Sequence, residues 1–95
     1  MLGYVLFDVD IIDQDKADKY RQMVPASLQP YGGRFIVRGG KVEELEGGWS
    51  THRLGIIEFP SVEQARAWYG SAEYAPAKAL RLEAMHAKLL IVEGV

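Results

Sequence analysis

A histidine, a tyrosine and a glutamate are the side chains of this sequence best suited to move a proton. His52 is one of two histidines, and its unperturbed pKa suits proton transfer near neutral pH. Glu46 lies shortly before it, beside a Gly-Gly pair, and Tyr74 follows an expected helix break at Gly70. We therefore predict His52, Tyr74 and Glu46 as the catalytic candidates.

Arginines and aromatic residues form a second group, which is suited to binding. Tyr74, Lys78 and Arg81 are spaced by four and three residues, so they share one face of a helix. An arginine fork matches a carboxylate, and Tyr and Trp side chains provide apolar walls with a polar tip. The sequence therefore predicts a pocket for a small, partly apolar anion. Its binding residues are Arg81, Arg53, Trp68 and Tyr20.

Each of these residues also has a purely structural interpretation. Trp68 and Tyr20 fit ordinary core positions, and His52 and His86 fit ordinary surface positions. Arg81 lies in a stripe that otherwise faces apolar residues, so its charge needs a partner. The candidate partners within the chain are Glu58, Glu73 and Glu46.

The composition excludes several classes of site. The chain has no cysteine, which rules out disulfides, zinc–thiolate sites, iron–sulfur clusters and thiol nucleophiles. Two histidines offer few metal ligands, and neither a G-x-G-x-x-G motif nor a phosphate-binding P-loop is present. We expect no metal and no cofactor. The net charge of −2 gives no basic patch for nucleic acid or for an anionic membrane.

Length and composition indicate one ordinary globular domain over residues 1–95. The first ten residues, MLGYVLFDVD, lack a basic region and carry Asp8 and Asp10, unlike a signal peptide. The longest apolar run is far below the roughly 20 residues that cross a bilayer. We therefore expect a cytoplasmic protein.

Four strands and intervening helices are expected to position the candidate residues. Alternating β-branched and aromatic residues predict strands at 3–11, 33–38, 51–59 and 87–93, with 41–45 continuing the second strand past Gly39-Gly40. Asp13 is a candidate cap for a first helix that kinks or restarts at Pro25 and ends at Gly32-Gly33. Ser61 to Gln64 form a capping box for a helix that stops at Gly70, and a further helix follows from Ser71 to about Ala84. The order β-α-β-β-α-β predicts an α+β, ferredoxin-like antiparallel sheet with the helices on one face.

Both faces of the predicted sheet are apolar. One parity gives the core face, under the helices: Val5, Phe7, Val9, Ile11, Phe35, Val37, Ile57 and Phe59. The other parity mixes apolar residues with charges of both signs: Tyr4, Leu6, Ile36, Leu54 and Ile56 with Asp8, Arg34, Arg38 and Glu58. Such a face is rarely left exposed in a monomer. We predict a homodimer in which a second copy covers it; the alternative is a half-exposed sheet with arginine stems over the apolar residues.

A series of motifs in order along the chain resembles the uncharacterised bacterial family called domain of unknown function 1330. The motifs are Tyr31 to Arg34, Arg38 to Gly40, Glu46-Gly47, Glu58 to Ser61, Ala65 to Tyr69, Glu73-Tyr74 and Arg81. The resemblance implies the dimeric α+β barrel superfamily, in which two ferredoxin-like subunits pack their sheets into one barrel. It also implies kinship with muconolactone isomerases, antibiotic-biosynthesis monooxygenases, haem-degrading enzymes and stress-responsive barrel proteins, but it gives no activity.

Three functions remain open at this point. The first is an enzyme without cofactor that acts on a small, partly apolar anionic metabolite by acid–base or oxygen chemistry in the cleft between helices and sheet. The second is a non-catalytic ligand-binding or stress-response dimer that uses the same cleft. The third, ranked last, is a haem-handling protein with His52 or His86 as ligand.

Overall fold

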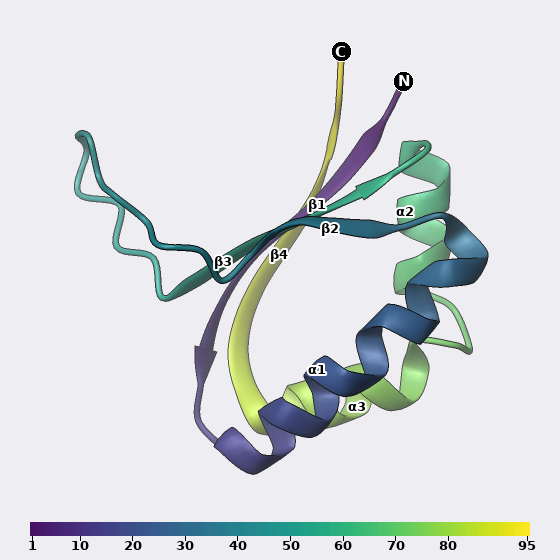
Figure 1. The fold of residues 1–95 in the computed structure, drawn as a ribbon, viewed down its shortest axis with the longest axis horizontal. Coiled ribbons are helices and arrows are strands. Elements are labelled where there is room, and N and C mark those ends of the chain that lie inside the picture. Colours follow the sequence, from purple (N-terminus) through teal and green to yellow (C-terminus); the bar gives the residue numbers. More distant parts are fainter.

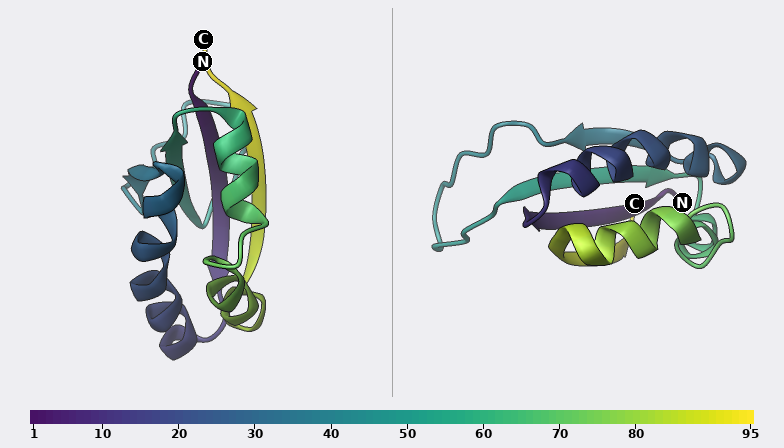
Figure 2. Two further views of the ribbon diagram at one scale, coloured as in Figure 1. Left: turned by 90° about the vertical axis from the view of Figure 1, so that its right-hand side faces the viewer. Right: turned by 90° about the horizontal axis from the view of Figure 1, so that it is seen from below.

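A computed structural model describes residues 1–95 and confirms the predicted ferredoxin-like order. The strands are β1 (Gly3–Ile11), β2 (Arg34–Arg38), β3 (Arg53–Phe59) and β4 (Met85–Glu93). The helices are α1 (Gln14–Leu28), a short 3-10 helix η1 (Gln29–Tyr31), α2 (Val62–Tyr69) and α3 (Ala75–Ala84). The strands pair antiparallel in the order β2-β3-β1-β4, and the helices cover one face of the sheet (Figures 1 and 2).

Side-chain caps fix the helix boundaries close to the predicted positions. The carboxylate of Asp13 accepts a hydrogen bond from the Lys16 amide at 3.1 Å, and Ser61 Oγ accepts one from the Gln64 amide at 3.1 Å. Ser71 Oγ donates to the Trp68 carbonyl at 2.7 Å and accepts from the Tyr74 amide at 3.1 Å, so it joins the end of α2 to the turn before α3. α3 therefore begins later than predicted, at Ala75.

Pro25 does not restart the first helix. α1 runs through it to Leu28, and η1 then ends at Gly32, whose φ of 69° is in the left-handed region. Because proline has no N–H, the helix makes no i→i−4 bond to the carbonyl of Arg21. That carbonyl is free for another donor.

The expected continuation of β2 over residues 41–45 is wrong. Residues 39–52 form an exposed segment without regular structure, here called the β2–β3 arm. Gly39, Gly47 and Gly48 adopt φ values of 69°, 98° and 69°, which interrupt an extended strand. Figure 1 shows the arm projecting past the sheet on the side opposite to the helices.

A β-bulge in β2 corrects the expected faces of two residues. The register shifts between Phe35 and Val37, so Val37 pairs with Ile56 and Arg38 pairs with Gly55. Val37 therefore lies on the helix-free face and Arg38 on the helix-covered face, the reverse of the prediction, because the extra residue changes the alternation of the strand.

The core lies between the sheet and the helices. Its largest fully buried side chains are Trp68, Tyr74, Phe59, Val5 and Val24. Gly55 belongs to this packing: a Cβ there would come within 2.0 Å of the Phe7 ring, so the ring can lie against β3 only over a glycine. None of the helices combines the length and the apolar sequence that crossing a membrane requires.

Candidate functional site

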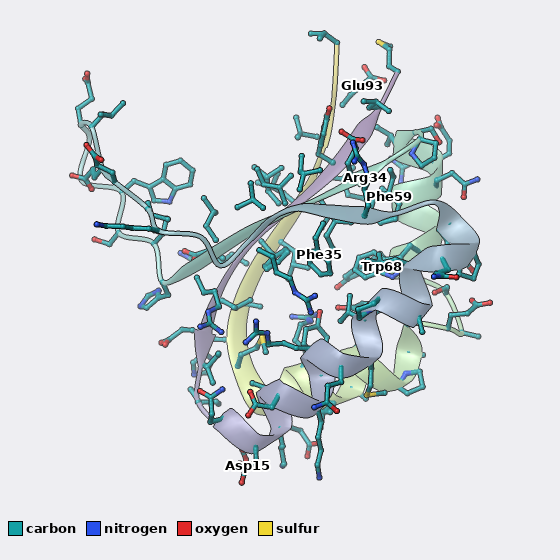
Figure 3. The ribbon with its side chains drawn as sticks, in the orientation of Figure 1. Asp15, Arg34, Phe35, Phe59, Trp68 and Glu93 are labelled. Carbon is teal, nitrogen blue, oxygen red and sulfur yellow. The ribbon has the colours of Figure 1, made fainter.

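A cavity of about 50 Å³ lies between the helices and the sheet, at the end of the core where β2 and β3 leave for the arm. Figure 3 shows Phe35 and Trp68 in the space between these layers. Most of the lining is apolar and comes from strands and helices alike: Phe7, Val9, Ile11, Val24, Phe35, Ile57, Trp68, Met85 and Leu89. The polar lining residues are Tyr20 and four arginines, Arg21, Arg38, Arg53 and Arg81, and no acidic residue or histidine lines the cavity.

Arg81 reaches the cavity from α3 without a counterion. It is 5 % exposed, and its buried Nε atom has no hydrogen-bond partner. The predicted alternative of an intrachain ion pair is wrong for all three glutamates. Glu58 pairs with Arg34 at 2.9 Å, Glu73 accepts from Tyr31 at 2.8 Å, and Glu46 lies in the exposed arm.

Arg53 reaches the cavity from the sheet. Its backbone amide donates to Asp8 Oδ1 at 3.1 Å, which holds the start of β3 against β1. Its side chain lies on the helix-covered face, because Arg53 pairs with Val9, and its buried Nη1 atom has no partner. A guanidinium cannot lose its charge in a protein, so a buried and unpaired one carries a desolvation cost.

Arg38 is a third arginine at the cavity, although strand alternation predicts it on the helix-free face. Its Nη2 donates to the free Arg21 carbonyl at 2.9 Å, and its guanidinium lies 4.2 Å from the centre of the Phe35 ring. Burial, followed by the nearby charge of Arg21, lowers the pKa of Arg38. Pro25 was the one sequence signal for this contact, since it predicts a carbonyl without a helix partner.

Two phenols meet beside the cavity. Tyr20 of α1 and Tyr74, which precedes α3, share a hydrogen bond of 2.8 Å between their hydroxyl oxygens. Tyr74 is fully buried and its ring lies 4.1 Å from that of Trp68, centre to centre. Burial raises the pKa of Tyr20 and the neighbouring Tyr74 raises it further, so the Tyr20 hydroxyl stays neutral.

Trp68 belongs to both the core and the cavity wall. It is 1 % exposed, and its indole N–H donates to Ser27 Oγ at 3.0 Å. The bond to Ser27 satisfies its polar atom, so the ring is fixed as an apolar wall. The four predicted binding residues, Arg81, Arg53, Trp68 and Tyr20, therefore line one cavity.

The predicted catalytic residues are not brought together. Tyr74 is next to the cavity, because its hydroxyl is hydrogen-bonded to that of the lining residue Tyr20. His52 is exposed, and its Nε2 lies 3.9 Å from Asp10 Oδ2. His52 and His86 line a separate hollow of about 220 Å³ with Asp8, Asp10 and Lys88. Glu46 lies in the exposed β2–β3 arm. In no part of the chain do three or more His, Asp or Glu side chains gather closely enough to hold a metal ion.

The model of one protein family matches residues 2–95, which is nearly the whole chain. The chain belongs to the family described as domain of unknown function 1330 (DUF1330). Among proteins with curated descriptions, none matches this DUF1330 chain in sequence.

Several solved structures share the fold of this DUF1330 protein. A protein of unknown function from Rhodopseudomonas palustris is 17% identical, with a TM-score of 0.79 over 99% of this chain and 82% of its own. A dimeric ferredoxin-like protein of unknown function from Jannaschia sp. CCS1 is 11% identical, with a TM-score of 0.72 over 99% and 100%. SnoaB, a cofactor-independent oxygenase from Streptomyces nogalater, is 7% identical, with a TM-score of 0.70 over 99% and 93%. At these identities the likeness shows the fold alone: a ferredoxin-like sheet of the kind found in dimeric proteins.

Proposed function

We propose that the cavity of this DUF1330 protein binds a small, partly apolar organic anion. The observation that supports the proposal is the pair of buried arginine nitrogens, Nε of Arg81 and Nη1 of Arg53, that have no partner in the protein. Buried polar groups are almost always satisfied, and a buried charge without a partner destabilises the fold. An anion between the two guanidiniums supplies the missing acceptors.

The rest of the lining indicates what else the ligand carries. Apolar side chains form most of the wall, so the ligand needs an apolar part to replace water there. The hydroxyl of Tyr20, already paired with that of Tyr74, offers one neutral hydrogen-bonding group. In this proposal Arg81 and Arg53 hold the charge, Tyr20 orients a polar atom, and Trp68 contacts the apolar part.

Thermal unfolding with small carboxylates tests the proposal. At constant ionic strength, butyrate and benzoate raise the melting temperature of the wild type, because they bind the folded chain only. Arg81→Met reduces this response, because one of the two unpartnered donors is lost. Arg66→Met, at an exposed position of α2, is the matched control and keeps it. An equal response of wild type and Arg81→Met, or no response to either anion, overturns the proposal.

A second candidate function is cofactor-independent catalysis on the same anion. The Tyr20–Tyr74 pair favours it, because a neutral phenol beside cationic arginines can donate a hydrogen bond to an oxygen on which negative charge develops. SnoaB, a cofactor-independent oxygenase, has the same fold. His52 and Glu46 lie outside the cavity and have no part in this proposal.

Exchange of the α-protons of 2-oxobutanoate with deuterium from solvent, followed by NMR, separates catalysis from binding. Solvent base accepts the α-proton, because no acidic residue or histidine lines the cavity, and an enzyme that stabilises the enolate increases the exchange rate. Tyr20→Phe lowers this increase by a larger factor than it lowers the affinity for 2-oxobutanoate. If the probe binds but exchanges no faster than in buffer, the site only binds. The haem-handling alternative receives no support from the geometry, since neither histidine lines the cavity.

We also propose that the protein is a homodimer that pairs through the helix-free face of the sheet. Large apolar side chains are exposed there: Leu90 is 56 % exposed, Val92 45 % and Ile36 43 %. The β2–β3 arm, with Trp49 68 % exposed, projects on the same side (Figure 1). A second copy that covers this face removes the apolar surface from water, and solved proteins of this fold are described as dimeric.

A further inference from the structure

The two unpartnered nitrogens at the cavity come from opposite walls. Arg81 belongs to α3 and extends from the helix layer, whereas Arg53 belongs to β3 and extends from the sheet. The third arginine, Arg38, is already oriented by the Arg21 carbonyl and the Phe35 ring. The cavity thus has one free donor from the helix layer and one from the sheet.

The charge of the lining is one-sided. Arg21, Arg38, Arg53 and Arg81 line the cavity, and the lining includes no aspartate or glutamate. The one acidic side chain that pairs with an arginine is Glu58, which contacts Arg34 on the helix-free face. A single carboxylate neutralises only one of these four charges, whereas a second acidic group neutralises another.

We infer that the ligand of this cavity carries two acidic groups on a short carbon skeleton, one held by Arg81 from α3 and the other by Arg53 from β3. This inference rests on the proposed anion-binding function and specifies its substrate class as small dicarboxylic acids. Each carboxylate receives charge-assisted hydrogen bonds from one guanidinium. The skeleton is short because the cavity is only about 50 Å³ in volume.

Three probes of similar size distinguish the effect of the number of acidic groups on affinity from the effect of the total charge. Butyrate carries one carboxylate, succinate carries two, and ethyl phosphate carries both charges on one group. Isothermal titration at constant ionic strength and near neutral pH measures the three dissociation constants. Succinate binds the wild type at least about tenfold more tightly than butyrate, a difference equivalent to one added charge-assisted contact. It also binds more tightly than ethyl phosphate.

Variants of Arg81 and Arg53 test whether each arginine binds one of the two acidic groups. In Arg81→Met and in Arg53→Met, the preference for succinate over butyrate falls to about onefold, because only one guanidinium with a free buried donor remains. Arg66→Met keeps the wild-type preference, since Arg66 is exposed on α2. Circular dichroism and the melting temperature establish that each variant is folded. Should either variant fail to fold, Arg81→Lys and Arg53→Lys retain the charge but lose the planar fork, and they show a reduced preference.

The outcomes are distinct. Equal affinity for succinate and butyrate in the wild type overturns this inference and leaves the anion-binding function in place. Tighter binding of ethyl phosphate than of succinate also overturns it, since both charges then occupy one position. Absence of binding by all three probes overturns the inference together with the proposed function. A succinate preference that persists in Arg81→Met contradicts the assignment of the second group to Arg81.

Discussion

The side chain of Arg38 donates a hydrogen bond to the backbone carbonyl of Arg21 at 2.9 Å. This carbonyl is free because Pro25, four residues later in α1, has no N–H to bond it. The contact joins the edge strand β2 to α1 and fixes the guanidinium at the cavity, over the Phe35 ring. A proline that weakens a helix thus provides the acceptor that orients a cavity residue.

Replacing this proline tests the relationship. Pro25→Ala restores an i→i−4 donor to the Arg21 carbonyl, which then competes with Arg38. We expect the free energy of unfolding to rise by roughly 1–3 kcal/mol as the helix gains its bond, while succinate binds severalfold more weakly. Urea unfolding and calorimetric titration measure the two effects. Pro76→Ala is the control, because Pro76 lies in the first turn of α3, where no such bond is lost. Unchanged affinity in Pro25→Ala contradicts the proposed competition.

Arg81 is expected to destabilise the fold in the absence of ligand. Arg81→Met keeps the length of the side chain but removes a buried charge without a partner, so the free energy of unfolding rises by roughly 1–3 kcal/mol. Urea unfolding without added anions is the measurement. Arg66→Met, at an exposed position, changes the free energy by no more than about 0.5 kcal/mol. A loss of stability in Arg81→Met means that Arg81 has a partner within the fold.

Alkaline titration tests the environment of Tyr20. Its pKa is raised above the ordinary 10.0 by burial and by Tyr74, so the folded chain keeps this proton while the unfolded chain loses it near pH 10. The contribution of the Tyr20 phenol to the free energy of unfolding is fully present below that pH. It falls as pH rises, because the unfolded state then binds fewer protons than the folded state.

The measurement is the ultraviolet absorbance of tyrosinate, to which the five tyrosines of the chain contribute. Before unfolding, wild type and Tyr20→Phe show the same increase in tyrosinate absorbance between neutral pH and pH values just above 10. In urea, the variant shows one tyrosinate fewer. A difference of one tyrosinate in the folded state contradicts a raised pKa for the partly buried Tyr20 phenol.

The helix-free face is tested by placing a charge on it, at Leu90 of β4. Leu90→Lys places an ammonium on a face that we propose is covered by the second copy, so the dimer dissociates into 10.6 kDa monomers. Sedimentation equilibrium measures the mass. Leu82→Lys is the matched control: Leu82 is 66 % exposed on α3, on the opposite side of the molecule, and its replacement leaves the dimer intact. A wild type that sediments as a monomer contradicts the proposed dimer.

Periodicity and capping were sufficient to predict the architecture, because the signals are local. The alternation of Gly3–Ile11, the Asp13 and Ser61 caps and the break at Gly70 correspond to elements of the structure. Residues 41–45 were predicted as strand, but their glycine neighbours and the lack of a paired segment leave them in the arm. Whether residues 41–45 have a partner strand depends on the rest of the fold, so it could not be predicted from these residues alone.

The candidate site was predicted in part. Arg81 and Tyr20 share faces with apolar residues, and this spacing was enough to place them at one cavity. Arg38 was missed, because a single bulge between Phe35 and Val37 reverses the alternation on which the prediction depended. His52 was expected at the cleft, but it lies before β3, near Asp10, on the far side of the sheet.

The most direct test of anion binding is NMR observation of the Arg81 side chain. The Nε–H of Arg81 is buried without an acceptor, so its proton resonance should shift strongly and saturably as succinate is added to the dilute protein. The Nε–H of the exposed Arg66 should not shift beyond the effect of added salt. An Arg81 resonance that stays unchanged, or that moves only in parallel with Arg66, would show that no anion occupies the cavity.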